Sequence, residues 1–554
     1  MIGILTEERH RRIAEEFFQL FKTPWEFVIP GKYYDVVLTT TDIRERLNTS
    51  LLIVYSSKAL DVDSYEQINL RENKKQRVLS FENECIPLYK ESAILISSRS
   101  SIAFYLDSED VAALKIIENE RTIFRLGYDL LDEVGYLLVQ GQPADMASYP
   151  TLDAHINLLR QLIFSGNSPL LEIPPMPPGF SFIAALTHDV DFAGIRFHGC
   201  DHSMKGFLYR ANLGSLRRWL TGRLSLKNML NNWLTVLSLP FVMAGWKKDF
   251  WMQFDKYIQV ERPFKSTFFI IPYKNRSGHH VSMLHRGRRA TKYDVEDIQD
   301  IIKKLLAAGK EVALHGIDAW DDPIAAIDEK RRIESFSLKE LKGVRMHWLC
   351  FSKESANFLE GAGFEYDSTI GYNETIGFRT GTLQVFQPME CQRLLELPLH
   401  IQDTAMFYPD FQDWKNKVAW RQCRKIFDQA EKYGGVVTLL WHERSLGPER
   451  HWGRFYDRLL RELKKRKAWI TSASEIVTWF QSRRQIIFKA IRQNENGFIV
   501  KLERLDPKSP LSFIVRLHPG NDNRFIDVAW SHEPEINIPF PPKNYKERNT
   551  PALI

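Results

Sequence analysis

The chain has 554 residues, which is too long for one ordinary hydrophobic core and predicts two or three domains. Hydrophobic residues make up 44% and charged residues 26%, which excludes a disordered or fibrous chain. The 75 Lys and Arg residues nearly balance the 69 Asp and Glu residues, so the net charge of +6 predicts no binding to nucleic acid. The five cysteines are scattered without a C-x-x-C pair, so we expect neither disulfides nor a cysteine metal site.

The amino terminus carries charges where a signal peptide has an apolar segment, as its first residues MIGILTEERHRRIAEEFF show. The most apolar later window, 233–246, is interrupted by Pro240 and is shorter than the ~20 residues that a membrane-spanning helix requires. We therefore expect a cytoplasmic protein with no signal peptide and no transmembrane helix.

Residues 1–172 mix helix-like and strand-like segments and predict an α/β domain of unknown role. The expected segments are an opening helix, strands at 34–41, 51–57 and 93–98, and helices at 122–139 and 152–163. We find no catalytic constellation among them. Residues 171–180, LEIPPMPPGF, contain four prolines and indicate a linker.

From residue 173 to about residue 483, hydrophobic runs that end in polar residues alternate with helical segments. The strand-like runs are 182–186, 265–272, 311–320, 395–407 and 434–443. This alternation predicts parallel strands covered by helices, and the length favours a (β/α) barrel that is seven-stranded or distorted. Residues 484–554 predict a small antiparallel β module followed by a loose, proline-rich tail.

A segment at about 198–248 interrupts the barrel pattern. It carries eight Lys or Arg residues against one acidic residue, with leucines and tryptophans between them. One interpretation is a helical insertion packed on the barrel with a solvated basic face. The other is a peripheral contact with anionic lipid or an acidic polymer, which requires that the apolar side is left uncovered.

The first barrel strand ends in Thr-His-Asp-Val-Asp. Alternation along an extended chain places Asp189 and Asp191 on the same side of the strand. Two carboxylates so near each other repel, which favours either a metal with a neighbouring base or a carboxylate pair that shares one proton. A third interpretation is that these residues only cap the next helix.

Polar residues also follow the later strands. His315 and Asp318 follow one, Arg345 and His347 the next, and His442 the last. Because the carboxyl ends of barrel strands meet at one rim, we expect these side chains to converge with the two aspartates.

These motifs, taken in order, resemble the polysaccharide deacetylase domain, also called the NodB-homology domain, of carbohydrate esterase family 4. THDVD, STFF, EVALH, the arginine segment VRMHW and LLWH follow the order and approximate spacing of that family over residues 180–480. The chain is most similar to a divergent branch in which a domain of unknown function precedes the deacetylase domain.

The resemblance implies a catalytic base at Asp189 and metal ligands at Asp191 and His315. Val190 separates two aspartates that are adjacent in the family, and Ala319 stands where the family has its second metal histidine. The candidates for the remaining ligand are His347, Asp318 and His188, and His347 is the preferred one. Zinc is the divalent metal that imidazole and carboxylate ligands favour.

The resemblance also implies that Arg345 orients the base and that His442 is the general acid, with Arg379 competing for the role of Arg345. Further residues near the strand ends are expected to bind substrate, or in the case of the tryptophans to belong to the core. They are Asp318, Trp320, Trp348, Arg379 and Trp441.

The function that this implies is metal-dependent removal of an N-acetyl group from an amino sugar in a cell-surface glycan or its precursor. Without a secretion signal, a lipid-linked or nucleotide-linked precursor is the favoured carbohydrate substrate. One alternative is an inactive barrel that binds glycan or a protein partner. Another is an amidase that acts on a small amide other than a sugar.

Overall fold

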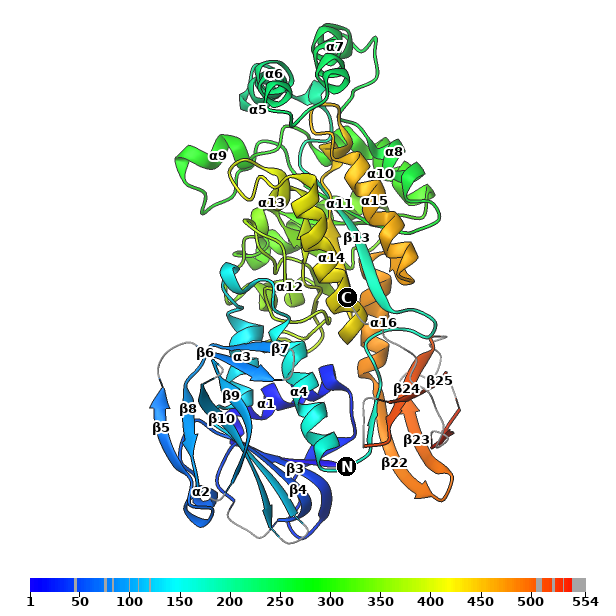
Figure 1. The fold of residues 1–554 in the computed structure, drawn as a ribbon. Helices are drawn as coiled ribbons and strands as arrows, with labels where there is room; N and C mark the ends of the chain where they lie inside the picture. Colours follow the sequence, from blue (N-terminus) through cyan, green and yellow to red (C-terminus); the bar gives the residue numbers. More distant parts are fainter. Residues whose placement is uncertain are drawn as a thin grey trace. The chain divides into compact units, whose positions relative to one another are not determined.

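The chain folds into two compact units, seen in the computed structural model in Figure 1. Unit 1 comprises residues 1–179, 380–382 and 479–554, and unit 2 comprises 180–379 and 383–478. The structure describes residues 1–43, 47–73, 77–81, 84–98, 100–107, 109–118, 121–504, 511–520, 524–531 and 533–540. The tail predicted to be loose lies mostly outside these residues.

Unit 1 is built on a mixed sheet with the order β2-β1-β3-β4-β11-β10-β9-β6-β7. Its strands are β1 (Ile2–Leu5), β2 (Trp25–Phe27), β3 (Tyr33–Thr39), β4 (Asn48–Tyr55), β6 (Arg77–Phe81), β7 (Glu84–Leu88), β9 (Ser101–Leu106), β10 (Asp110–Glu118) and β11 (Arg121–Leu126), with β5 (Asn69–Asn73) and β8 (Ser92–Ile96) paired separately. Its helices are η1 (Glu8–His10), α1 (Arg11–Phe21), α2 (Asp61–Tyr65), α3 (Leu130–Val139), η2 (Ala144–Met146) and α4 (Thr151–Ser165).

The helix predicted over residues 122–139 is wrong in its first part. Residues up to Leu126 form β11, which pairs with β4 and β10. The helix α3 begins only after Asp129, whose carboxylate accepts hydrogen bonds from the backbone N–H groups of Leu131 and Asp132. The β-branched and aromatic residues of β11 fit a buried sheet position, and the N-cap aspartate marks the true start of the helix.

The strands after residue 484 belong to unit 1, although the sequence predicts them as a separate module. In one antiparallel sheet β12 (Leu170–Glu172) pairs with β24 (Phe513–His518), which pairs with β25 (Ile526–Trp530). A second contains β22 (Ile486–Asn494), β23 (Gly497–Arg504) and β26 (Glu535–Pro539). A strand from before the barrel therefore completes a sheet made from the end of the chain.

Unit 2 contains a curled sheet in which every pairing is parallel, with the order β18-β17-β16-β15-β14-β13-β20-β19. The strands are β13 (Phe182–Val190), β14 (Thr267–Ile270), β15 (Glu311–Gly316), β16 (Gly343–Met346), β17 (Tyr366–Asp367), β18 (Leu395–Glu396), β19 (Ile401–Gln402), β20 (Val436–Leu440) and β21 (Ala468–Thr471). Three of them have only two residues, so the sheet is distorted as the sequence allows. The first half of β13 pairs with β21 and its second half with β14.

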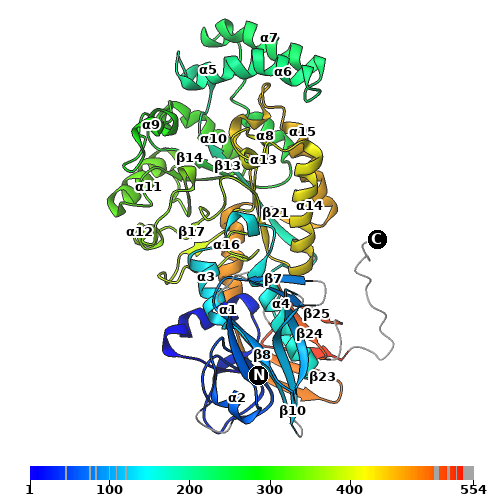
Figure 2. The same ribbon diagram turned by 60° about the vertical axis from the view of Figure 1, so that its left-hand side comes forward.

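Helices surround this sheet (Figures 1 and 2). They are η3 (Ile195–Phe197), α8 (Phe254–Val260), α9 (Met283–Arg289), η5 (Val295–Ile298), α10 (Gln299–Ala307), α11 (Pro323–Ser337), η6 (His347–Leu349), α12 (Ser355–Gly361), α13 (Asp403–Phe407), α14 (Asn416–Tyr433), η7 (Glu443–Leu446), α15 (Gly453–Lys465) and α16 (Ala473–Arg484), which crosses the unit boundary. The run 395–407, predicted as one strand, divides into β18, β19 and α13.

The basic segment folds into α5 (His202–Tyr209), η4 (Arg210–Gly214), α6 (Ser215–Leu220) and α7 (Leu226–Met243). Figures 1 and 2 both draw α5, α6 and α7 together at one end of unit 2. One side of the segment packs in a small core around Phe207, Val242 and Trp251. Among the described helices, none combines the length and the apolar composition needed to cross a bilayer.

Candidate metal and catalytic site

The strand β13 presents charged groups on both of its faces, and its last residues lead directly into Asp191. Every residue of the strand is buried. Phe182, Ala184, Leu186 and Val190 belong to the main hydrophobic core of unit 2. Thr187 and Asp189 alternate with them and point to the opposite side, where the other strand ends deliver polar groups.

His188 lies on the core side and contacts a buried carboxylate. The Glu261 oxygens accept four hydrogen bonds of 2.6–2.8 Å, from His188 Nε2, Tyr456 Oη, Ser266 Oγ and Lys310 Nζ. The second ring nitrogen of His188 lies 2.7 Å from the carbonyl oxygen of Trp441. His188, one of the three candidates for the remaining metal ligand, is therefore engaged in a structural network away from the other ligands.

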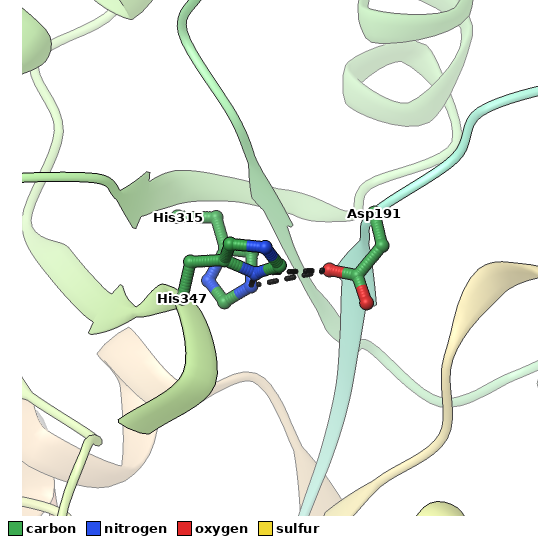
Figure 3. A group of neighbouring side chains, drawn as sticks. All are labelled: Asp191, His315 and His347. Atoms are coloured by element: carbon green, nitrogen blue, oxygen red, sulfur yellow. Dashed lines mark hydrogen bonds and ion pairs between the residues drawn. The ribbon is translucent and has the colours of Figure 1, made fainter. Parts of the chain in front are cut away.

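On the opposite side, three side chains from different segments converge (Figure 3). His315 comes from β15, His347 follows β16, and Asp191 follows β13. Asp191 Oδ1 lies 3.4 Å from His315 Nε2 and 3.4 Å from His347 Nδ1, and the two ring nitrogens are 3.1 Å apart. We call these three residues the ligand triangle.

The hydrogen bonds behind the two histidines fix where their protons lie. His315 Nδ1 is 2.9 Å from the carbonyl oxygen of Arg345, and His347 Nε2 is 3.0 Å from that of Arg289. A carbonyl oxygen only accepts, so each of these nitrogens carries a proton, and in the neutral ring that a metal binds the opposite nitrogen has the lone pair. The nitrogens that face each other and Asp191 then present lone pairs.

The carboxylate adds a third acceptor to the triangle. Burial raises the pKa of Asp191, but His347, His315 and His442 outweigh it and hold this pKa well below its usual range. Burial lowers the pKa of His347, which favours the neutral ring. Within the described part of the chain, Asp191 Oδ1 is buried without a hydrogen-bond partner. Three acceptors that face one another in a buried position favour a cation or a shared proton between them.

The size of the triangle fits a divalent metal. Two ligands at zinc distances are about 3.4 Å apart in tetrahedral geometry. The observed edges of 3.1, 3.4 and 3.4 Å are close to that value. The residues therefore fit a three-ligand site with one open position, as in catalytic zinc sites.

Asp189 is held beside the triangle by a buried arginine. Arg345 Nη1 donates to Asp189 Oδ1 at 3.0 Å and to Thr187 Oγ1 at 2.8 Å. Its other nitrogens donate to Ser368, and the guanidinium lies 4.4 Å from the Phe269 ring centre. Arg345 is thus rigidly placed, and the second oxygen of Asp189 lies 3.7 Å from His315 Nε2.

His442 lies on the other side of Asp191 and is paired with a carboxylate from α13. Asp403 Oδ1 is 2.6 Å from His442 Nδ1, and Asp403 Oδ2 accepts from the His442 backbone N–H at 2.8 Å. Burial lowers the pKa of His442, but Asp403, Asp191 and Asp189 outweigh it and raise this pKa to about 10. His442 Nε2 then carries a proton and lies 3.7 Å from Asp191 Oδ2.

The residues predicted to bind substrate divide into two groups. Trp441 is fully buried and stacks on Tyr456 at 5.2 Å, which favours the alternative that it belongs to the core. Arg379 lies over the rings of Phe351 and Tyr372, while the partner of Asp189 is Arg345.

Three predicted residues follow the strands β15 and β16. Trp348 is 40% exposed, its ring centre is 6.0 Å from that of His347, and its φ of 65° is in the left-handed region. Trp320 is half-buried against the core and contacts His280. Asp318, a candidate ligand, accepts from the backbone N–H of His279 at 2.8 Å. Of the three predicted tryptophans, Trp348 is the most exposed, and its ring lies beside His347.

Sequence reasoning missed three residues that shape the site. Asp403 holds His442, and Arg289 supplies the carbonyl oxygen behind His347. Glu443 accepts from the Asp191 backbone N–H, and burial together with Asp191 raises its pKa to about 7. Asp403 lies inside a run predicted to be a strand, and the signal that could have found it is its place after the polar end of β19. The sequence offers no comparable signal for Arg289.

No family model and no curated protein matches the chain. Among solved structures, it is similar to one assigned as a polysaccharide deacetylase from Mycobacterium smegmatis (17% identity, 56% of this chain and 96% of that chain, TM-score 0.34). It is also similar to an allantoinase, with 13% identity over 55% of this chain and 92% of that chain (TM-score 0.33). A third similar structure is a CE4 family pseudoenzyme from Bacillus anthracis, with 12% identity over 55% of this chain and 70% of that chain (TM-score 0.27). The similarity covers little more than half of the chain.

Proposed function

We propose that unit 2 is a metal-dependent hydrolase that removes the N-acetyl group from an amino sugar in a cell-surface glycan or its precursor. The observation that carries the proposal is the ligand triangle, in which three buried acceptors face one another at zinc-like spacing. A base held by an arginine and a protonated imidazole held by a carboxylate flank it. Metal-assisted hydrolysis of an amide uses these three functions together.

The metal would be held by Asp191, His315 and His347. A bound divalent cation, preferably zinc, supplies Lewis-acid polarisation of the amide carbonyl. The two histidine rings are held in orientation for this role, because the ring N–H groups of both face backbone carbonyl oxygens.

The chain's own residues account for the proton transfers. Asp189, oriented by Arg345, takes a proton from the attacking water. His442, kept protonated by Asp403, gives its proton from Nε2 to the leaving amine. Arg345 and Asp403 act through these groups and are positioning residues.

An aromatic ring beside the triangle supports a sugar as the substrate. Trp348 exposes its ring beside His347, and sugar rings stack on such faces. Its backbone is held in the left-handed region, as is that of Leu349, at a cost of about 1–3 kcal/mol each. Strain of this kind is concentrated at functional sites.

The test combines metal content with turnover. Purified protein should hold one zinc per chain by elemental analysis and release acetate from N-acetylhexosamine oligomers. Chelation should abolish the activity, and added zinc should restore it. A chain that binds no metal under any loading would instead be the inactive binding barrel. Metal-dependent cleavage of small cyclic amides without acetate release would identify the amidase alternative.

A further inference from the structure

Three arginines gather beside the site in a way that the proposed chemistry does not use. Arg444 and Arg450 follow His442 and are buried, and Arg210 reaches the same place from the helical insertion. Arg444 and Arg450 both donate to Tyr408 Oη, at 2.8 and 2.7 Å. We call these three arginines the arginine cluster.

The arginine cluster contains donors without an acceptor among the described residues. Glu449 Oε1 lies 3.7 Å from Arg210 Nη2, and both oxygens of Glu449 are buried without a hydrogen-bond partner in that part of the chain. Nε of Arg210 and Nε of Arg450 are also buried and unpaired there. Glu443 and Asp191 also act on the pKa of Arg444, and Asp403 on that of Arg450. Burial, Arg450 and Arg444 together lower the pKa of Arg210 to about 9, as crowding of like charges requires.

The arginine cluster lies next to the ligand triangle. The Arg444 guanidinium carbon is 3.6 Å from the ring centre of Phe192, which directly follows Asp191 in the chain. Asp191 is also close enough to act on the pKa of Arg444, and His442 to act on that of Tyr408. A substrate bound at the triangle therefore has a cationic neighbour.

We propose that Arg210, Arg444 and Arg450 form a subsite for a phosphate or diphosphate group of the substrate. The inference rests on the proposed function for the link to turnover. Guanidinium groups bind phosphate oxygens with strong, charge-assisted hydrogen bonds. Because Arg210 belongs to the insertion, the insertion completes this subsite.

Calorimetric titration with inorganic pyrophosphate tests the subsite on the full chain. Titration in a chelator prevents pyrophosphate from binding a metal at the ligand triangle. The wild-type chain should bind, and Arg210→Gln should weaken binding about tenfold or more, as loss of a charge-assisted hydrogen bond requires. Arg223→Gln, which removes an exposed arginine of the same insertion, is the matched control and should bind like the wild type.

Two results would overturn the subsite: no pyrophosphate binding by the wild type, or equal binding by Arg210→Gln. Both are independent of acetate release, so the subsite and the proposed function fail separately. In turnover, Arg210→Gln should raise KM for N-acetylglucosamine 1-phosphate and leave KM for N-acetylglucosamine unchanged.

A second observation concerns the outer side of the insertion, which is apolar and uncovered. Large apolar side chains there are mostly exposed, namely Leu213 (65%), Leu220 (70%), Leu234 (62%), Leu237 (71%), Phe241 (51%) and Trp246 (80%). The condition that the sequence sets for a membrane contact, an uncovered apolar side, is therefore met.

Exposed cations accompany these apolar side chains. They are Arg217, Arg218, Arg223, Lys227, Lys247 and Lys248. Helices with apolar side chains and flanking Lys or Arg residues lie in the interface of a bilayer, and anionic headgroups attract the cations. A second copy of the chain would bring like charges together and is less favoured.

We propose that the face formed by α6 and α7, together with the residues that follow to Trp246, binds the surface of an anionic bilayer. Cosedimentation of the full chain with phosphatidylcholine vesicles, with and without phosphatidylglycerol, tests this. The wild type should pellet with the anionic vesicles. The double variant Leu237→Glu, Trp246→Glu should stay in the supernatant.

The control is Ile324→Glu, which changes a residue of α11 that is 76% exposed, and it should pellet like the wild type. The proposal is overturned if the wild type does not bind anionic vesicles, or if the double variant binds equally. It is also overturned if the double variant instead dissociates a dimer seen by light scattering, because the face then binds a second copy.

Discussion

The two faces of β13 differ in how completely their charged groups are paired. On the core side, both oxygens of Glu261 accept two hydrogen bonds each, and both ring nitrogens of His188 have acceptors. On the other side, Asp191 and the facing nitrogens of His315 and His347 form a set that a cation or a shared proton would complete. His188 on one face and His315 and His347 on the other are all buried. Only around His188 and Glu261 do protein groups satisfy every hydrogen-bonding atom.

This difference teaches how to separate structural from functional buried charge. A buried carboxylate with all its hydrogen bonds made stabilises the fold and needs nothing further. A buried set of acceptors without donors costs stability unless a ligand supplies the missing charge. The arginine cluster shows the opposite imbalance, because the described residues offer no acceptor to the buried Nε donors of Arg210 and Arg450. The following predictions test this separation.

The largest effect is expected from Asp191→Asn. It removes the charge that holds the metal, so zinc should be lost and acetate release should fall about 1,000-fold or more. Elemental analysis and turnover measure the two quantities. A stable variant that keeps zinc and activity would contradict the ligand triangle.

The next largest effect is expected from His442→Gln. It removes the proton donor while leaving the ligand triangle intact, so kcat should fall about 100-fold to 1,000-fold with zinc content unchanged. Turnover and elemental analysis on the same sample separate the two effects. Unchanged kcat would exclude His442 as the general acid.

On the core face, Glu261→Gln should affect stability. It leaves the His188 and Lys310 cations without their buried partner, so the free energy of unfolding should fall by about 3–5 kcal/mol. Zinc per folded chain should stay at the wild-type value. Loss of zinc without loss of stability would reverse the assignment of the two faces.

The same network predicts a dependence of stability on pH. Burial raises the pKa of Glu261, but His188 and Lys310 outweigh it and lower this pKa to about 2 from an ordinary 4.5. A carboxyl whose pKa is lower in the folded state stabilises the fold above its unfolded pKa. This contribution, about 3 kcal/mol, should be lost as the pH falls from about 4.5 to about 2. Denaturant unfolding across this range should show a smaller loss in Glu261→Gln.

The smallest effect is expected from Trp348→Ala. Loss of the exposed ring beside His347 should raise KM for an N-acetylhexosamine oligomer about threefold to tenfold, in line with ~1 kcal/mol for an aromatic contact. Zinc content and kcat should remain unchanged. Ile324→Ala, at an exposed position on α11, serves as the control. An unchanged KM would remove Trp348 from the substrate site.

Local sequence signals predicted much of the fold and the centre of the site. Apolar runs ending in polar residues located β13, β14, β15 and β20, and alternation placed Asp189 and Asp191 together. Errors arose where one pattern hid two elements. In 122–139 a strand precedes a capped helix, and in 395–407 two short strands precede α13. The burial of Trp441 depends on packing against Tyr456, which no local pattern contains.

The sequence by itself determined which strand ends carry acids, imidazoles and arginines, because period-two alternation is a property of the local backbone. Only the tertiary structure decided that His347 joins Asp191 and His315, that Asp403 holds His442, and that Arg210 reaches Arg444. These pairs are separated by between 30 and 240 residues along the chain. Their meeting depends on strand register and on the path of the insertion, which packing sets over the whole of unit 2.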